Sequence, residues 1–173
     1  YAETHPDRVK ALILRGIFCC RRKELLWFYQ EGASMIFPDA WDKYLEPIPL
    51  AEHGDLMSAY HRRLTGTNQD ELLKVATAWS VWELATSRLY VDPSYIAHAT
   101  DDAKFAMAFA RIETHYFVHG AFMDEDGQLL KNADRIKDIP GVIVQGRYDV
   151  VCPARTAWDL HKVWSKGELH WVD

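Results

Sequence analysis

The type and position of Asp149 suggest a role in chemistry. It follows a short apolar run at 142–144, which begins after a Pro-Gly turn and ends before Gly146. Such a run is typical of a strand buried on both faces of a parallel sheet. Asp149 therefore lies just past a predicted carboxyl end, the edge at which parallel sheets carry ligand-binding and catalytic loops. Spacing alone favours a simpler role, as a helix cap or part of a turn.

Glu83 and Glu113 are carboxylates on the buried faces of two predicted helices. Glu83 continues an apolar stripe that includes Trp79, and Glu113 continues one that includes Phe109 and Phe117. A carboxylate on a buried face costs roughly several kcal/mol in desolvation unless a positive or hydrogen-bonding group meets it. From the residues alone, pairing with an arginine is the favoured interpretation, and the candidates are Arg15, Arg88 and Arg111.

Two patterns resemble metal sites but lack the full set of ligands. His115 and His119 stand four residues apart on one predicted helix face, which is the spacing of a two-histidine metal pair. No glutamate follows His115, and no third ligand is evident. The acidic run at 124–127 lacks the alternating ligands of a calcium loop, so we interpret it as a turn. We therefore predict no metal site. The sequence also contains no glycine-rich phosphate loop that would suggest a nucleotide cofactor.

The pattern of apolar residues predicts an α/β fold that positions these side chains. Strands are expected at 9–14, 142–145 and 168–172, and helices at 22–30, from 37 onward, and at 50–64, 69–89, 102–117 and 153–164. The stretch from 19 to 135 reads as helical throughout, which is too long for an ordinary crossover between parallel strands. We predict core at 1–18, an all-helical cap or lid at 19–135 inserted between two strands, and further core at 136–173 that carries Asp149.

Bulk composition narrows the class of protein. The 173 residues are 49% hydrophobic, which is ample for a core, and carry a net charge of −5. That charge argues against binding to nucleic acid or to an anionic membrane. The odd set of cysteines, Cys19, Cys20 and Cys152, suggests no disulfide framework and favours a reducing, cytoplasmic location. No apolar run in the sequence is long enough for a membrane span.

Four stretches of the sequence resemble one enzyme family. They read GRYDVVCP at 146–153, LRGIF at 14–18, WSVWE at 79–83 and ARIETHYF at 110–117. Around them, essentially the whole chain resembles the prolyl aminopeptidases, also called proline iminopeptidases, in order and with few gaps. Members of that family are α/β-hydrolase serine exopeptidases that remove an amino-terminal proline. The resemblance implies a partial α/β-hydrolase fold, peptide substrates with an N-terminal proline, and no metal or organic cofactor.

The resemblance also implies roles for individual residues. Asp149 matches the triad acid that orients a histidine, and Glu83 and Glu113 match two acids that hold the substrate's free amino group. The residues that match the wall of the proline pocket are Phe18, Phe28, Val151 and Cys152. Phe28 stands where the family often has a tyrosine, and Val151 where it can have a smaller residue. Both departures leave open the volume of the pocket and its tolerance of hydroxyproline or alanine.

The same resemblance predicts that this chain is an internal fragment. The sequence contains no Gly-x-Ser-x-Gly nucleophile elbow, and no catalytic histidine loop follows its last predicted strand. The chain alone is therefore expected to be inactive, because it lacks the serine and the histidine of the triad. Two alternatives stay open. One is an α/β hydrolase acting on an ester or epoxide, without lid carboxylates facing the cleft. The other is a non-catalytic, lid-bearing module that binds amines or partner proteins.

Overall fold

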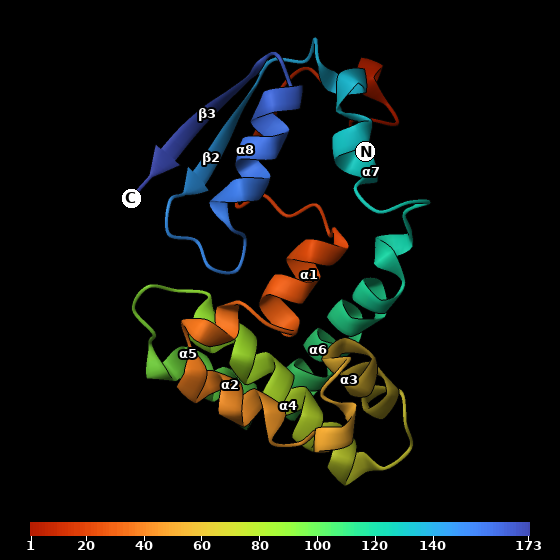
Figure 1. Cartoon of the computed structure of the whole chain (residues 1–173), viewed down its shortest axis with the longest axis vertical. Helices are drawn as coiled ribbons and strands as arrows, with labels where there is room; N and C mark the ends of the chain where they lie inside the picture. The colour runs from red at the N-terminus through yellow and green to blue at the C-terminus, as the bar shows by residue number, and fades with distance from the viewer. The chain divides into compact units, whose positions relative to one another are not determined.

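The computed structural model describes residues 1–173 and contains two compact units (Figure 1). We call residues Tyr1–Glu24 with Met123–Asp173 the sheet unit, and Leu25–Phe122 the helical unit. The sequence places the ends of the lid elsewhere, at 19 and 135. That assignment concerns the role of the segments, and it stays a prediction.

The sheet unit is built on three parallel strands, which confirms the α/β class. They are β1 (Leu12–Arg15), β2 (Gly141–Gly146) and β3 (Gly167–Val172), in the order β1-β2-β3. β1 pairs with β2 although Gly141, the partner of Leu12 in the register, lies 129 positions further along the sequence. Every element between β1 and β2 is helical, so a large helical insertion separates two neighbouring strands. The sequence predicted this arrangement.

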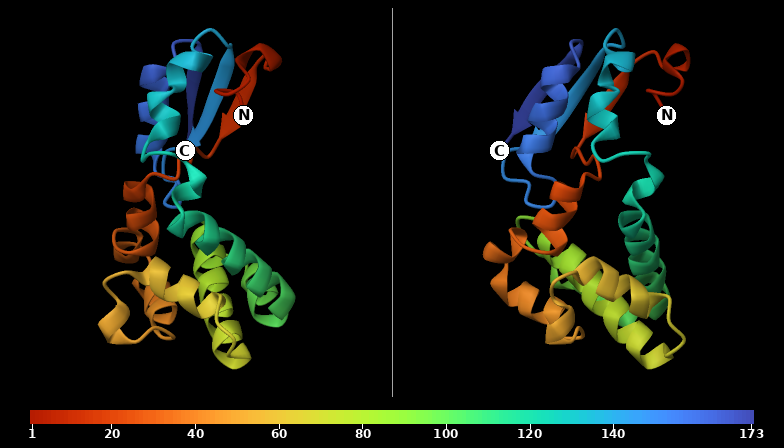
Figure 2. Two further views of the ribbon diagram at one scale, coloured as in Figure 1. Left: turned by 90° about the vertical axis from the view of Figure 1, so that its right-hand side faces the viewer. Right: turned by 45° about the vertical axis from the view of Figure 1, so that its right-hand side comes forward.

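One face of the sheet is covered by α8 (Ala154–Val163), which lies along the strands (Figure 2). Ile143 and Trp164 are fully buried in the core between them. Gly141 is required there, because an added Cβ would lie 2.3 Å from the Trp164 ring and 2.5 Å from the Leu12 carbonyl oxygen. The short elements of this unit are η1 (Pro6–Arg8), α7 (Gln128–Lys131) and η5 (Ala133–Ile136).

The expectation of a strand buried on both faces was wrong for β2 within this unit. Ile143 and Gln145 are buried, whereas Val142 and Val144, which point to the opposite face, are only half-buried. On β1, Ile13 pairs with Val142 and is 84% exposed. The physical reason is that successive side chains of a strand alternate between faces, and the helix layer of this unit covers one face only.

The helical unit contains six α-helices with an aromatic core. They are α1 (Arg22–Tyr29, which begins in the sheet unit), α2 (Pro38–Leu45), α3 (Leu56–Leu64), α4 (Gln69–Thr86), α5 (Pro93–Asp101) and α6 (Ala103–Val118). Short 3₁₀ turns are η2 (Ala33–Met35), η3 (Leu50–Glu52) and η4 (Gly120–Phe122). The aromatic core of this unit contains four fully buried side chains: Tyr44, Tyr60, Trp79 and Trp82.

Local hydrogen bonds explain where several predicted elements begin and end. The helix expected at 50–64 is interrupted, because the Asp55 side chain accepts a hydrogen bond from Ser58 N at 3.1 Å and caps a helix that starts at Leu56. The helix expected at 69–89 ends at Thr86, and the sequence analysis did not predict α5 or α7. β1 starts at Leu12 rather than Val9, since its first partner, Gly141, follows Pro140, which has no N–H to extend the ladder.

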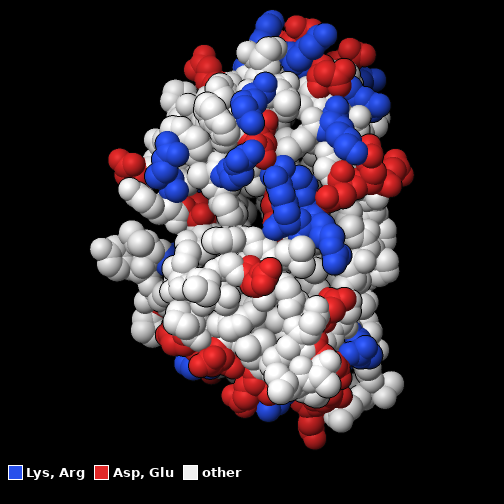
Figure 3. Space-filling view, viewed as in Figure 1, with Lys and Arg blue, Asp and Glu red and all other residues white.

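Two further features are the distribution of charged side chains on the surface and the character of the helices. On the face drawn in Figure 3, basic side chains are interspersed with acidic ones. None of the helices combines the length and the apolar character that crossing a membrane requires.

Candidate functional site

Asp149 lies in the loop that joins β2 to α8 in the sheet unit and is half-buried. Its Oδ1 accepts a hydrogen bond from the backbone N–H of Cys152 at 2.8 Å. The carboxylate therefore closes a tight turn, which is the simpler role that spacing favoured. That bond occupies one carboxylate oxygen, so the turn is compatible with a second partner on Oδ2.

Gln145 is a site residue that sequence reasoning missed. It is fully buried, and its Oε1 accepts from Ile17 N at 2.9 Å. Its Nε2 donates to the Cys152 carbonyl oxygen at 2.9 Å and lies 3.4 Å from Asp149 Oδ2. A polar residue within an apolar strand was the available signal, because a buried amide must find partners for its donors and its acceptor.

The predicted wall residues of the sheet unit are Phe18, Val151 and Cys152. Phe18 is 39% exposed and, with its neighbour Cys19, lines a hollow of about 430 Å³ beside β1. Asp149, Val151 and Cys152 are not among the residues that line it. Val151 and Cys152 are half-buried in the loop after Asp149. Their joint role in a proline pocket stays a prediction.

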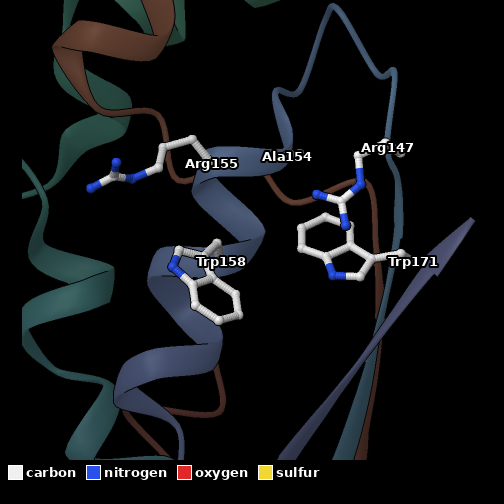
Figure 4. A pocket seen from close by; sticks show the side chains of 5 residues that line it. All are labelled: Arg147, Ala154, Arg155, Trp158 and Trp171. Atoms are coloured by element: carbon white, nitrogen blue, oxygen red, sulfur yellow. The ribbon is translucent and has the colours of Figure 1, made fainter.

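A second hollow, of about 400 Å³, lies at the other flank of the Asp149 loop (Figure 4). The Arg147 guanidinium lies over the Trp171 ring at 3.8 Å, a cation–π contact. Arg155 binds Asp159 at 2.8 Å, and Trp158 forms another wall. The sequence analysis did not single out this hollow. Its two arginines favour an anionic rather than a cationic occupant.

In the helical unit, each predicted acid meets a single aromatic donor. Glu83 on α4 is 8% exposed and accepts a hydrogen bond from the Tyr29 hydroxyl. Glu113 on α6 is half-buried and accepts from Trp79 Nε1 at 2.7 Å. The two donor rings are stacked, with centroids 4.5 Å apart and planes 9° from parallel. One pair of stacked rings therefore orients both carboxylates.

Phe28, the remaining predicted wall residue, is buried in the same aromatic core. It is 2% exposed, and its ring lies 4.9 Å from that of Tyr29 and 5.3 Å from that of Trp82. Phe28 thus supports the ring that donates to Glu83. Its contact with a substrate stays a prediction.

Burial shifts the pKa of both glutamates upward. For Glu83, burial is the main cause and the charge of Glu113 is the second, and together they raise its pKa well above the usual value of 4.5. Burial also raises the pKa of Glu113, to about 7, against the opposing effect of the Trp79 hydrogen bond. Near neutral pH the pair therefore carries fewer than two negative charges.

The arginine pairing favoured by the residues alone is not found within the helical unit. Arg111 donates from Nε to the Leu64 carbonyl oxygen at 2.8 Å, and Arg88 lies over the Tyr95 ring at 4.1 Å. Neither glutamate forms a salt bridge with a residue of its own unit. The two acids thus have donors for orientation but no cation for neutralisation.

A different buried carboxylate, in the sheet unit, is fully partnered. Glu24 Oε1 accepts from Arg21 Nη2 at 2.8 Å and from the Thr156 hydroxyl, and Glu24 Oε2 accepts from the backbone N–H groups of Cys19 and Arg21. Arg21 also donates to Asp159 at 3.1 Å. This network ties the segment after β1 to α8.

The structure brings a third histidine to the pair noted in the sequence. His61 of α3 lies with its ring centroid 6.0 Å from that of His115 and 5.9 Å from that of His119. The cluster does not have the geometry to hold a metal ion, and no other group of three such ligands in the chain does. His119 Nδ1 is within 2.7 Å of the His115 carbonyl oxygen, which engages one ring nitrogen.

Comparisons with known proteins agree with the geometry. The sequence model of the alpha/beta hydrolase fold family matches residues 1–173. The chain is 60% identical over 169 residues to a protein of Xylella fastidiosa (strain 9a5c) named "Proline iminopeptidase", covering 98% of this chain and 54% of that protein. Proteins of the same name from Arabidopsis thaliana and Neisseria gonorrhoeae are 49% and 42% identical, over 98% and 99% of this chain and 44% and 54% of their own lengths. The chain therefore spans about half the length of the curated relatives it matches.

Proposed function

This chain belongs to the α/β hydrolase fold family, and we propose that it forms part of a prolyl aminopeptidase that releases N-terminal proline from peptides. The proposal follows the name that its relatives share over nearly all of this chain. The other half of the whole protein would supply the nucleophilic serine and the histidine of the triad.

The observation that carries the proposal is a pair of acids, Glu83 buried and Glu113 half-buried, that have no cation in their unit. Glu83 and Glu113 each accept one hydrogen bond from an aromatic side chain. Desolvation makes the charged form of such a carboxylate costly until a positive group arrives. A substrate ammonium would supply that charge, together with up to three donors for the two carboxylates.

The same pair would account for specificity toward a free amino terminus. A peptide whose amine is acylated has no positive charge to offer, so binding it would leave both acids buried without a cation. That penalty discriminates against internal prolines, because it weakens the binding of the wrong substrate. Exopeptidase selectivity would thus arise from the helical unit.

Asp149 would serve the chemical step. In the proposed triad it orients the histidine and stabilises the imidazolium that forms when the serine attacks the prolyl carbonyl. The serine oxygen forms an acyl bond to proline as the C–N bond breaks, and the imidazolium donates its proton to the leaving amine. Water then hydrolyses the acyl-enzyme.

The test uses the whole protein that contains this chain, with proline p-nitroanilide and its N-acetyl derivative as substrates. We expect turnover of the free-amine substrate only. Glu83→Gln and Glu113→Gln should each lower kcat/KM by roughly 10- to 100-fold, because a hydrogen bond to a charged group contributes about 1.5–3 kcal/mol. Glu46→Gln is the matched control, since Glu46 is an exposed acid of the same unit that pairs with Lys74.

Two results would contradict the proposal. Unchanged kinetics in both glutamine variants would reject the ammonium role of the acids. Equal turnover of the acetylated and free substrates, or turnover of an aryl ester without an amine and no turnover of prolyl substrates, would favour an α/β hydrolase of another specificity.

A further inference from the structure

Gln145 connects three segments of the sheet unit that come from distant parts of the sequence. It is the residue before the last of β2 and is fully buried. Its amide oxygen holds the backbone N–H of Ile17, next to Phe18, and its amide nitrogen holds the carbonyl oxygen of Cys152. Each bond is 2.9 Å long. One side chain therefore joins the exit of β1 to the loop that carries Asp149.

The contact with Cys152 fixes the Asp149 carboxylate indirectly. The Cys152 N–H donates to Asp149 Oδ1 at 2.8 Å, and the Cys152 carbonyl oxygen accepts from Gln145. Both backbone groups of Cys152 are thus engaged, so the turn that holds Oδ1 cannot rotate without breaking the bond to Gln145. Asp149 Oδ2 has only a long contact, 3.4 Å, with the Gln145 amide nitrogen. The arrangement commits Oδ1 to the turn and leaves Oδ2 able to accept from another donor.

We infer that Gln145 is a positioning residue for the triad acid: it fixes the Asp149 carboxylate so that Oδ2 meets the histidine, and it sets Ile17 and hence Phe18 relative to the same loop. This inference rests on the proposed function, because it assigns Gln145 a role through Asp149.

The amide group is suited to this position and its closest analogues are not. Leucine would leave the Ile17 N–H and the Cys152 carbonyl oxygen without a partner in a buried place. Ionised glutamate could accept from Ile17, but its second oxygen would face the Cys152 carbonyl oxygen and Asp149 Oδ2, all of them acceptors. Protonated glutamic acid has an O–H that could donate as the amide does. The effect of glutamate at this position should therefore depend on pH.

The experiment measures kcat and KM for proline p-nitroanilide in the whole protein as a function of pH, for Gln145→Leu and Gln145→Glu. We expect kcat to fall about tenfold in both at alkaline pH, the size of one lost hydrogen bond in the transition state. KM should stay within about twofold in Gln145→Glu, because a glutamate oxygen can still accept from the Ile17 N–H and so keep Phe18 in place. The ratio of Gln145→Glu activity to wild-type activity should rise as pH falls.

A matched control separates positioning from simple loss of stability. Gln128 is a half-buried glutamine of the same unit whose Oε1 accepts from Asp124 N at 2.8 Å. Gln128→Leu removes a comparable side chain–backbone bond away from the Asp149 loop. It should lower the melting temperature without changing the pH profile of kcat.

Distinct results would overturn the inference and the proposed function. If Gln145→Glu keeps wild-type kcat and its activity ratio is constant with pH, Gln145 does not position Asp149. Should Gln145→Leu fail to fold, the Gln145→Glu ratio decides alone. If the unaltered protein cleaves no prolyl substrate, the proposed function fails. The inference is then tested by amide exchange in this chain at alkaline pH: unchanged exchange at Cys152 in Gln145→Glu overturns it, and faster exchange at Cys152 supports it.

Discussion

The two units bury carboxylates in opposite ways. In the sheet unit, Glu24 is 6% exposed and receives hydrogen bonds from a guanidinium, a hydroxyl and two backbone N–H groups. In the helical unit, Glu83 is 8% exposed and receives one hydrogen bond, from the Tyr29 hydroxyl. Exposure is nearly the same, so the difference lies in the partners.

This difference distinguishes a structural carboxylate from one that waits for a ligand. Glu24 has its counter-charge inside the fold and has no need of an external cation. Glu83 and Glu113 accept hydrogen bonds from two stacked aromatic side chains, carry raised pKa values and have no cation in their unit. Buried acids whose pKa values are raised by desolvation are candidates for function. Three experiments break or sharpen this contrast, from the largest expected effect to the smallest.

Removing Glu24 should have the largest effect on stability. Glu24→Ala leaves Arg21 and Thr156 buried without their shared partner, which costs about 3 kcal/mol for a broken buried ion pair. Amide hydrogen exchange at the β2 residues of this chain measures the loss as a lower free energy of opening. Glu168→Ala is the control, since that carboxylate is 78% exposed and pairs only with His170. Equal effects of the two substitutions would show that the Glu24 network is not needed.

The pH dependence of stability should reveal the paired acids. Because the folded pKa of Glu113 is raised from 4.5 to about 7, the folded state binds a proton more tightly than the unfolded state. The resulting stabilisation is fully present below the unfolded pKa and is lost as pH rises toward about 7, on the order of 2 kcal/mol. Urea denaturation of this chain across that window, followed by tryptophan fluorescence, measures it.

Glu113→Gln should flatten that pH dependence, because the amide does not titrate. Glu83 shifts in the same direction, so Glu83→Gln should also reduce the slope and the double variant should remove most of it. The exposed acid Glu46 again supplies the control. A wild-type slope of opposite sign through this window would refute the raised pKa values.

The smallest expected effect is on the orientation of Glu113 by Trp79. Trp79→Phe keeps an aromatic ring but removes the N–H that stabilises the charged carboxylate. The pKa of Glu113 should therefore rise further, because the free energy of ionising this carboxyl group increases by about 1 kcal/mol. A carboxyl-carbon NMR titration would detect it. Trp82→Phe is matched closely: Trp82 is also fully buried on α4, but its Nε1 has no hydrogen-bond partner. Equal shifts in both variants would argue against a specific Trp79 bond.

By itself, the sequence determined the local features of this protein. Helical spacing placed Glu83 and Glu113 on buried faces of α4 and α6, and an apolar run before Gly146 placed Asp149 after a strand, since side-chain periodicity depends only on near neighbours. Helix ends were less well predicted: Asp55 caps α3, which therefore begins at Leu56 and not at residue 50.

Only the tertiary structure decided which polar groups satisfy one another. Gln145 meets Ile17 across 128 residues of sequence, and Thr156 meets Glu24 across 132. It also decided that Arg88 and Arg111 turn to Tyr95 and Leu64 instead of the two glutamates. Such choices depend on which distant segments share a buried space, where each donor must find an acceptor, and the spacing of residues along the chain carries no record of that.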